Sequence, residues 1–296
     1  MTSETSPPKL TATTSDLPAA VSTALVRPSD GTVGSVDASG IAWRTISWGD
    51  PASAPLLLAH GVTSNAGIWW RVGPALAAAG RRVVAVDMPG HGPGTLWRGN
   101  HRFVETAEEL AGFIGAADLD RPDLAVVGHS WGAMVAAHLP LAGIRPARLV
   151  LVDPPCLPLE HLRAITLEST EQRYESIDTA RAAIRSEYPG WTARDVEAKA
   201  QALTEFDVDC VLSVLLRNGA WDGGMAALRE SAAEGISTWL IRGEWEMGGL
   251  ISDKDAEAME HQLGLGHVIT IAGGPHSPQR THPEATLLAI LRALGT

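Results

Sequence analysis

The stretch Val126-Val127-Gly128-His129-Ser130-Trp131-Gly132-Ala133 decides the fold of this chain. The apolar residues before Gly128 are typical of a buried strand, and the small residues from Ala133 onward are typical of a helix. Between them, Gly-X-Ser-X-Gly predicts a sharp strand-to-helix turn that lifts the serine hydroxyl clear of a parallel sheet. Glycine is expected at both ends of this turn, because a side chain there would collide with the neighbouring strand or helix.

Segments with strand and helix character alternate on both sides of this turn. Strands are expected at 31–37, 41–48, 55–59, 82–86, 123–127, 148–152, 237–241 and 267–271. Helices are expected at about 68–79, 101–117, 133–142, 253–263 and 283–294. This order predicts an α/β fold with a doubly wound, mostly parallel, eight-stranded sheet. Ligands bind such sheets at the carboxyl ends of the strands, where His60, Asp87, Ser130 and Asp153 stand.

The alternation stops between residues 156 and 235. This segment is rich in Ala, Glu, Arg and Leu at helical spacing and holds no convincing strand. So long an interruption between two sheet strands predicts an inserted helical lid over residues 156–235. The core is then expected at 29–155 and 236–296. Residues 1–28 begin with a Ser/Thr/Pro-rich stretch and are predicted to form a disordered tail.

Composition excludes several classes of function. A formal net charge of −11 without a basic cluster argues against nucleic acid as a partner. No run of eighteen apolar residues is present, so no membrane span is expected. Cys156 and Cys210 are too few for a disulfide scaffold and are interpreted as free thiols of a cytoplasmic protein. The ten histidines follow no metal-binding spacing, so no metal and no other cofactor is expected.

Four motifs, in this order and on these elements, resemble the α/β-hydrolase family. They are His60-Gly61, Asp87-Met88-Pro89-Gly90-His91-Gly92, Gly128-His129-Ser130-Trp131-Gly132 and Gly274-Pro275-His276-Ser277. The resemblance covers the chain from about residue 30 to its end. It implies that Ser130 is a nucleophile and His276 its general base. It also implies that the backbone N–H groups of Val62 and Trp131 form an oxyanion hole. His91 and His129 are expected to serve packing and loop hydrogen bonds.

The acid that orients His276 is ambiguous in the sequence. The family carries this residue after the seventh strand, usually as aspartate, or after the sixth. Glu246 stands at the first place, Asp153 at the second, and Glu244 is a third candidate. Glu246 is preferred, because Gly248 and Gly249 allow its loop to recede and Pro154-Pro155 restricts the backbone beside Asp153.

The substrate is expected to be an apolar small molecule. The chain holds ten tryptophans against two tyrosines, and Trp191 and Trp221 in the lid are predicted to line a substrate pocket. The leading function is hydrolysis of a carboxylic ester or lactone through an acyl-enzyme on Ser130. The alternatives are carbon–carbon bond hydrolysis of dienone or β-diketone substrates and a non-catalytic small-molecule receptor. Epoxide hydrolases and dehalogenases of the fold use an aspartate nucleophile, so Ser130 argues against both.

Overall fold

A mixed sheet forms the centre of the molecule. The computed structural model describes residues 7–93, 99, 101–168, 171–231 and 235–296. Among them, nine strands join in the order β1-β11-β10-β7-β6-β4-β5-β3-β2. They are β1 (Lys9–Leu10), β2 (Thr32–Ala38), β3 (Ile41–Trp48), β4 (Ala54–Ala59), β5 (Arg81–Val86), β6 (Ala125–His129), β7 (Arg148–Val152), β10 (Ser237–Arg242) and β11 (Val268–Ile271). The predicted doubly wound α/β sheet is confirmed, with one more strand than expected.

The sheet is parallel except at one edge. β3 pairs antiparallel with both β2 and β5, and the pairings from β5 through β4, β6, β7, β10 and β11 to β1 are all parallel. The central strands are buried on both faces, and Leu56, Leu57 and Leu58 of β4 are wholly inaccessible. Burial on both faces explains why these strands read as continuous apolar runs.

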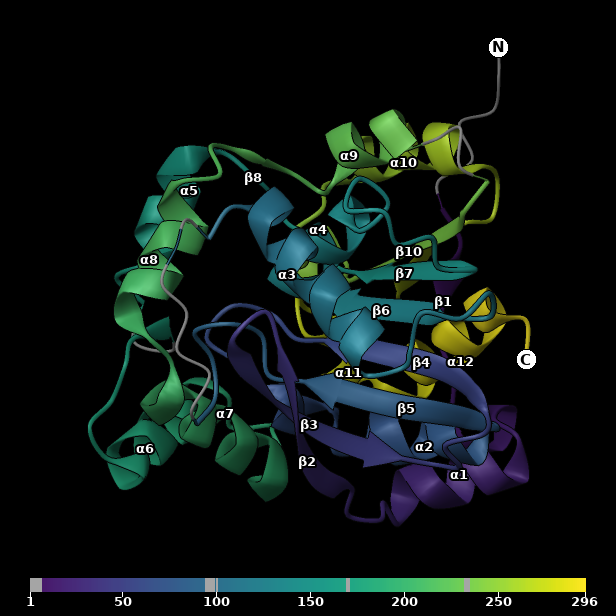
Figure 1. Ribbon diagram of the computed structural model, residues 1–296, viewed down its shortest axis with the longest axis horizontal. Helices are drawn as coiled ribbons and strands as arrows, with labels where there is room; N and C mark the ends of the chain where they lie inside the picture. The colour runs from purple at the N-terminus through teal and green to yellow at the C-terminus, as the bar shows by residue number, and fades with distance from the viewer. Residues whose placement is uncertain (1–6, 94–98, 100, 169–170, 232–234) are drawn as a thin grey trace.

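Helices cover both faces of the sheet (Figure 1). Leu57 faces a cluster with α3 and α4, whereas Leu56 and Leu58 face a cluster with α1, α2 and α12. Successive residues of a strand point to opposite faces, so one strand supplies both cores. The helices outside the lid are α1 (Ala19–Val26), α2 (Val72–Ala78), α3 (Phe103–Ala116), α4 (Trp131–His138), α9 (Met225–Ser231), α10 (Asp253–Leu263), α11 (Pro278–Thr281) and α12 (Pro283–Leu294), with 3₁₀ turns η1 (Thr14–Asp16), η2 (Ala66–Trp69) and η5 (Trp245–Met247).

The N-terminal segment differs from its prediction. Residues 1–6 lie outside the described residues, but from residue 7 onward the expected disordered tail is an ordered part of the fold. Lys9 and Leu10 extend the sheet beside Thr270 and Ile271. α1 then packs on α2 and buries Leu25. The Ser/Thr/Pro-rich composition gave no sign of these contacts, because both partners lie far away in sequence.

The lid is helical and lies at the carboxyl edge of the sheet (Figure 1). Its helices are α5 (Leu159–Ile165), α6 (Ile177–Glu187), α7 (Ala193–Glu205) and α8 (Val208–Leu216). The expectation of no strand in this segment is corrected, since β8 (Cys156–Leu157) and β9 (Trp221–Asp222) pair antiparallel where the lid leaves and rejoins the core. α9 contacts α4 and therefore covers the sheet, so the helical lid ends earlier than residue 235.

Side-chain caps explain where three lid helices begin. The Ser176 side chain accepts a hydrogen bond from Asp178 N, Thr192 from Asp195 N, and Asp207 from Cys210 N. A cap of this kind satisfies a backbone donor that has no partner inside the helix. The start of a helix at Thr192 places Trp191 just before it, in the loop after α6.

We predict that the N-terminal helix contributes to the stability of the whole core. Leu25 is 4% exposed and its neighbour Val26 is 63% exposed. Leu25→Ala removes buried methyl groups and should lower the free energy of unfolding by about 2–3 kcal/mol, whereas Val26→Ala should change it by less than ~0.5 kcal/mol. Urea denaturation followed by circular dichroism measures both. Equal effects of the two substitutions would show that α1 is not part of the cooperative core.

Candidate active site

Ser130 occupies the strained turn that the sequence predicts. Its backbone has φ 55° and ψ −123°, and it separates β6 from α4. A Cβ at Gly128 would overlap the carbonyl of Gly132, and one at Gly132 would overlap that of His60. Both glycines are therefore required by close backbone approach, and the turn is held in place by the strand and helix on either side.

A continuous chain of hydrogen bonds joins Ser130, His276 and Asp153. The Ser130 Oγ donates to His276 Nε2 at 3.0 Å, and His276 Nδ1 donates to Asp153 Oδ2 at 2.7 Å. His276 lies in the loop between β11 and α11, and Asp153 follows β7. A histidine held in this way can take the hydroxyl proton of a serine and so convert a weak nucleophile into a strong one.

Asp153 is wholly buried, and its carboxylate is fully hydrogen-bonded. Besides His276, it accepts hydrogen bonds from Gly243 N and Leu250 N, each at 3.0 Å. Its backbone is left-handed at φ 44°. The prolines after Asp153 thus do not turn its side chain away from His276.

The preference for Glu246 as the acid is corrected. Glu246 lies in the exposed 3₁₀ turn η5, and Glu244 forms an ion pair with Lys9 at 2.8 Å. The loop that carries both glutamates wraps over Asp153 through Gly243 and Leu250 and does not present a carboxylate of its own. The hydrogen bond expected of Glu246 is made by Asp153.

The loop after β4 lies directly against Ser130. A Cβ at Gly61 would stand 2.9 Å from the Ser130 Cβ. Val62 follows it and lines the same cavity as Ser130, and Trp131 begins α4. The two backbone positions predicted for an oxyanion hole therefore flank the serine. The loop is anchored at Thr63, whose hydroxyl bonds to both Glu171 and Lys199 of the lid.

Three buried histidines brace the loops around Ser130. His60 Nε2 accepts from Met88 N at 2.9 Å, and His91 Nε2 accepts from Thr63 N at 3.3 Å. His129 Nε2 donates to the carbonyl of His276 at 2.9 Å. Burial is the largest cause that lowers the pKa of His60 and His129 well below 6.5 and that of His91 to about 4. All three rings are therefore neutral near pH 7 and hold loops in place, as predicted for His91 and His129.

A cavity of about 850 Å³ opens beside Ser130 and His276. Core and lid both line it. Its apolar wall includes Leu157, Leu162, Ile165, Leu215 and Leu250. Trp191 and Trp221, the two tryptophans predicted to form a substrate pocket, both belong to its lining.

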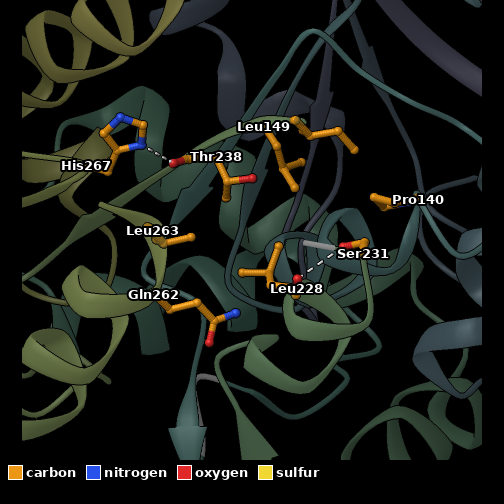
Figure 2. A pocket seen from close by; sticks show the side chains of 9 residues that line it. Pro140, Leu149, Leu228, Ser231, Thr238, Gln262, Leu263 and His267 are labelled. Carbon is orange, nitrogen blue, oxygen red and sulfur yellow. Dashed lines mark hydrogen bonds between the residues drawn. The ribbon is translucent and has the colours of Figure 1, made fainter. Parts of the chain in front are cut away.

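Figure 2 shows a second cavity, of about 210 Å³, lined by Pro140, Leu149, Leu228, Ser231, Thr238, Gln262, Leu263 and His267 among others. Leu149 and Thr238 stand near the amino ends of β7 and β10, which is the edge opposite Ser130. Two side chains drawn there hydrogen-bond to backbone carbonyls, His267 to Thr238 and Ser231 to Leu228. Strand polarity thus separates this cavity from the carboxyl edge, where ligands bind.

Six charged residues of the larger cavity are not among the predicted site residues. They are Arg71, Glu168, Glu171, Glu187, Lys199 and Arg280. All but Arg280 sit in segments with ordinary helical or loop composition, so no local signal marks them. Arg280 follows His276 by four residues, and this closeness to a predicted site residue was the only usable sign.

The described part of the chain holds neither a cluster of metal ligands nor a helix that could span a membrane. No group of three or more His, Cys, Asp or Glu among them is arranged to hold a metal ion. No helix among them has the length and apolar character needed to cross a membrane.

The alpha/beta hydrolase family model matches residues 56–289 of this sequence. The chain belongs to the alpha/beta hydrolase family. The match begins in β4 and ends in α12, so it takes in the serine turn, the lid and the histidine loop. Membership shows the fold, while the chemistry depends on the residues of the site.

Similar proteins agree with this family. Epoxide hydrolase A of Mycobacterium tuberculosis is 34% identical over 125 residues, which cover 42% of this chain and 38% of that protein. Lipase LipV of Mycobacterium tuberculosis is 27% identical over 272 residues, covering 84% of this chain and 96% of that protein. The solved structure of E-2-(acetamidomethylene)succinate hydrolase superimposes with a TM-score of 0.73 at 22% identity, covering 90% of this chain and all of that one. This last likeness shows the fold alone.

The buried histidines predict a loss of stability in mild acid. The unfolded chain protonates at His91 below pH 6.5, but the folded chain does so only near pH 4. The unfolded state therefore binds more protons between these values, and stability falls as pH falls through them. At pH 5, the shifted pKa of His91 should lower the free energy of unfolding by about 2 kcal/mol relative to pH 7. Urea titrations of wild type and His91→Gln at both pH values measure this effect. The free energy of unfolding should fall less between pH 7 and pH 5 in His91→Gln than in wild type, by that amount.

His261 supplies the matched control for this measurement, because it is an exposed histidine of α10. His261→Gln should keep the pH dependence of the wild type. An identical pH dependence in His91→Gln would contradict the assignment of a buried, neutral His91.

Proposed function

We propose that this chain is a serine hydrolase that cleaves a carboxylic ester or lactone bond of a small molecule through an acyl-enzyme on Ser130. The observation that carries the proposal is the hydrogen-bonded chain of Ser130, His276 and Asp153, of which Ser130 and His276 line the 850 Å³ cavity. In the proposal, Ser130 is the nucleophile, His276 the general base and Asp153 the acid of a catalytic triad.

The first half of the reaction forms the acyl-enzyme. His276 Nε2 takes the proton of Ser130 Oγ as the oxygen attacks the ester carbon. Asp153 accepts from Nδ1, holds the ring in the correct tautomer and stabilises the imidazolium that forms. The negative oxygen of the tetrahedral intermediate receives hydrogen bonds from the backbone N–H groups of Trp131 and Val62. The intermediate collapses when His276 protonates the leaving alkoxide, which departs as an alcohol.

The second half releases the acid. A water molecule gives a proton to His276 Nε2 and attacks the acyl carbon, and the same N–H groups stabilise the second oxyanion. His276 then returns the proton to Ser130 Oγ. The products are the carboxylic acid and the alcohol, which remain joined if the substrate is a lactone.

The lid supports selection of substrates with an apolar portion. Leu157, Leu162, Trp191 and Trp221 of the lid all line the cavity. Burying apolar groups of a substrate against such a wall contributes about 25 cal/mol per Å². The serine at the turn, where epoxide hydrolases of this fold carry aspartate, supports ester over epoxide chemistry.

Ser130 should be the single serine that reacts with a fluorophosphonate. Its hydroxyl is hydrogen-bonded to His276, which makes it the most nucleophilic serine of the chain. Mass spectrometry should find one adduct on the peptide that holds Ser130, and Ser130→Ala should abolish both the adduct and turnover of 4-nitrophenyl esters. A stoichiometric adduct on another serine would refute the proposed nucleophile.

Kinetics distinguishes Asp153 from Glu246 as the acid that orients His276. Asp153→Asn should lower ester turnover by ~10⁴-fold, because the amide favours the wrong histidine tautomer. Glu246→Gln is the matched control and should stay within about twofold of wild type, since Glu246 is exposed and the carboxylate bonded to His276 is that of Asp153. Thermal unfolding checks that both variants are folded. An inactive Glu246→Gln variant together with an active Asp153→Asn variant would show that Glu246, and not Asp153, is the acid.

A further inference from the structure

Two buried cations line the cavity on the side of lid helix α7 and core helix α11. Lys199 of α7 and Arg280 of α11 are each only 6% exposed, and both line the same cavity as Ser130 and His276. Charged side chains are rarely buried to this extent unless a charge of opposite sign compensates them. A cation that has no carboxylate partner within the protein can therefore bind an anionic group in the cavity.

The Lys199 charge is compensated within the protein. Its Nζ lies 3.0 Å from Glu171 Oε1 and donates to the Thr63 hydroxyl at 2.9 Å and the Thr63 carbonyl at 3.3 Å. Both charges of this pair are thus used to seat the lid on the loop after β4.

The buried carboxylate of Asp195, whose backbone carbonyl accepts a hydrogen bond from Arg280, also has partners within the protein. Asp195 Oδ1 accepts from Trp70 Nε1 at 2.9 Å, and Oδ2 accepts from the Thr192 hydroxyl at 2.6 Å. Arg71 Nη2 lies 3.4 Å from Oδ2 and completes the ion pair. The Asp195 carboxylate is therefore compensated by Arg71.

Arg280 has a different environment. Its Nη1 donates to the backbone carbonyl of Asp195 at 3.1 Å, and within the described part of the chain no carboxylate lies within ion-pair distance of its guanidinium. A guanidinium carries five N–H donors. Arg280 uses one of these donors for the Asp195 carbonyl. The other donors of this buried, permanently charged guanidinium can therefore bind a further partner in the cavity that Arg280 lines.

Aromatic stacking holds this guanidinium in place. Its carbon lies 4.6 Å from the ring centre of Trp191, and Trp191 in turn stacks on Tyr188 at 4.2 Å with 9° between the planes. Cation–π contact leaves the edge of the guanidinium available for hydrogen bonds in its plane. A carboxylate fits this edge, because its two oxygens match two parallel N–H groups.

We propose that Arg280 is an anion-binding residue of the active site and that the substrate is a small ester or lactone that carries a carboxylate group. The inference rests on the proposed function for the bond that is cleaved. The carboxylate would pair with Arg280, while the apolar remainder would lie against Leu157, Leu162 and Trp221. The substrate is then amphiphilic, which narrows the apolar small molecule expected from the tryptophan content.

The kinetic test compares esters that differ only in the carboxylate. One pair carries it on the acyl side, 4-nitrophenyl hydrogen glutarate against its methyl ester. The other carries it on the leaving group, 4-acetoxybenzoate against methyl 4-acetoxybenzoate. Wild type should prefer the charged member of one pair. In Arg280→Gln, the ratio of kcat/KM for charged over neutral ester should fall about ten- to a hundredfold for that pair, mainly through KM. Arg280→Lys should retain part of the ratio, since it keeps the charge but loses the planar donors.

Arg185→Gln is the matched control for overall charge. Arg185 is an exposed residue of lid helix α6 outside the cavity lining, so its loss should leave the ratio unchanged. An equal fall in both variants would assign the effect to long-range charge and overturn the inference. A wild-type ratio near one for both pairs would overturn it as well.

A binding measurement separates this inference from the proposed chemistry. Isothermal titration calorimetry on Ser130→Ala should show glutarate binding more tightly than glutaramide, and Ser130→Ala/Arg280→Gln should lose this difference. If glutarate binding depends on Arg280 but no ester is cleaved, the subsite stands and the proposed function fails. If esters are cleaved with a ratio indifferent to Arg280, and glutarate does not bind, the subsite fails alone. If Arg280→Gln does not fold, the glutarate affinities of Ser130→Ala and Ser130→Ala/Arg280→Lys are compared instead. Weaker binding by the lysine variant supports the subsite, and equal binding overturns it.

Discussion

The buried carboxylate of Asp153 is the constraint on which the site depends. It accepts hydrogen bonds from His276 Nδ1, Gly243 N and Leu250 N, and these donors follow β11 and β10 in the chain. A buried carboxylate without such donors would cost several kcal/mol. Since β7, β10 and β11 are neighbours in the sheet, satisfying one carboxylate ties three strand ends together. The position of His276 relative to Ser130 is thus a consequence of sheet register.

The lid is seated by polar contacts rather than by apolar packing alone. Lys199 reaches the Thr63 loop together with Glu171, and Asp195 receives Arg71 and Trp70 from the core. Buried ion pairs add little net stability, because desolvation offsets their attraction. They select one arrangement, however, since any displacement of α7 would leave buried charges unpaired. Arg280 also contacts the lid, because it donates to the Asp195 carbonyl and stacks on Trp191. The seating of the lid therefore also positions this cation of the cavity.

Local sequence accounted for most elements and for two of the three hydrogen-bonded side chains. β7, α10 and α12 coincide with their expected residues, because strand and helix periodicity and a Ser252 cap are local properties. Ser130 and His276 were identified because each stands in a short motif next to its own strand. The N-terminal strand β1 and helix α1 were missed, because their partners are β11 and α2. Pairing with a distant strand leaves no trace in the composition of a short segment.

What the sequence by itself determined is the α/β-hydrolase fold, the strained serine turn and the histidine loop, since each depends on residues adjacent in the chain. Only the tertiary structure decided between Glu246 and Asp153, because hydrogen bonding to His276 depends on how the loop after β10 folds over the end of β7. The tertiary structure alone also revealed that Arg280 is buried and has N–H donors without a partner among the described residues. Compensation of a charge is a property of everything that surrounds it in space, and no stretch of sequence contains that information.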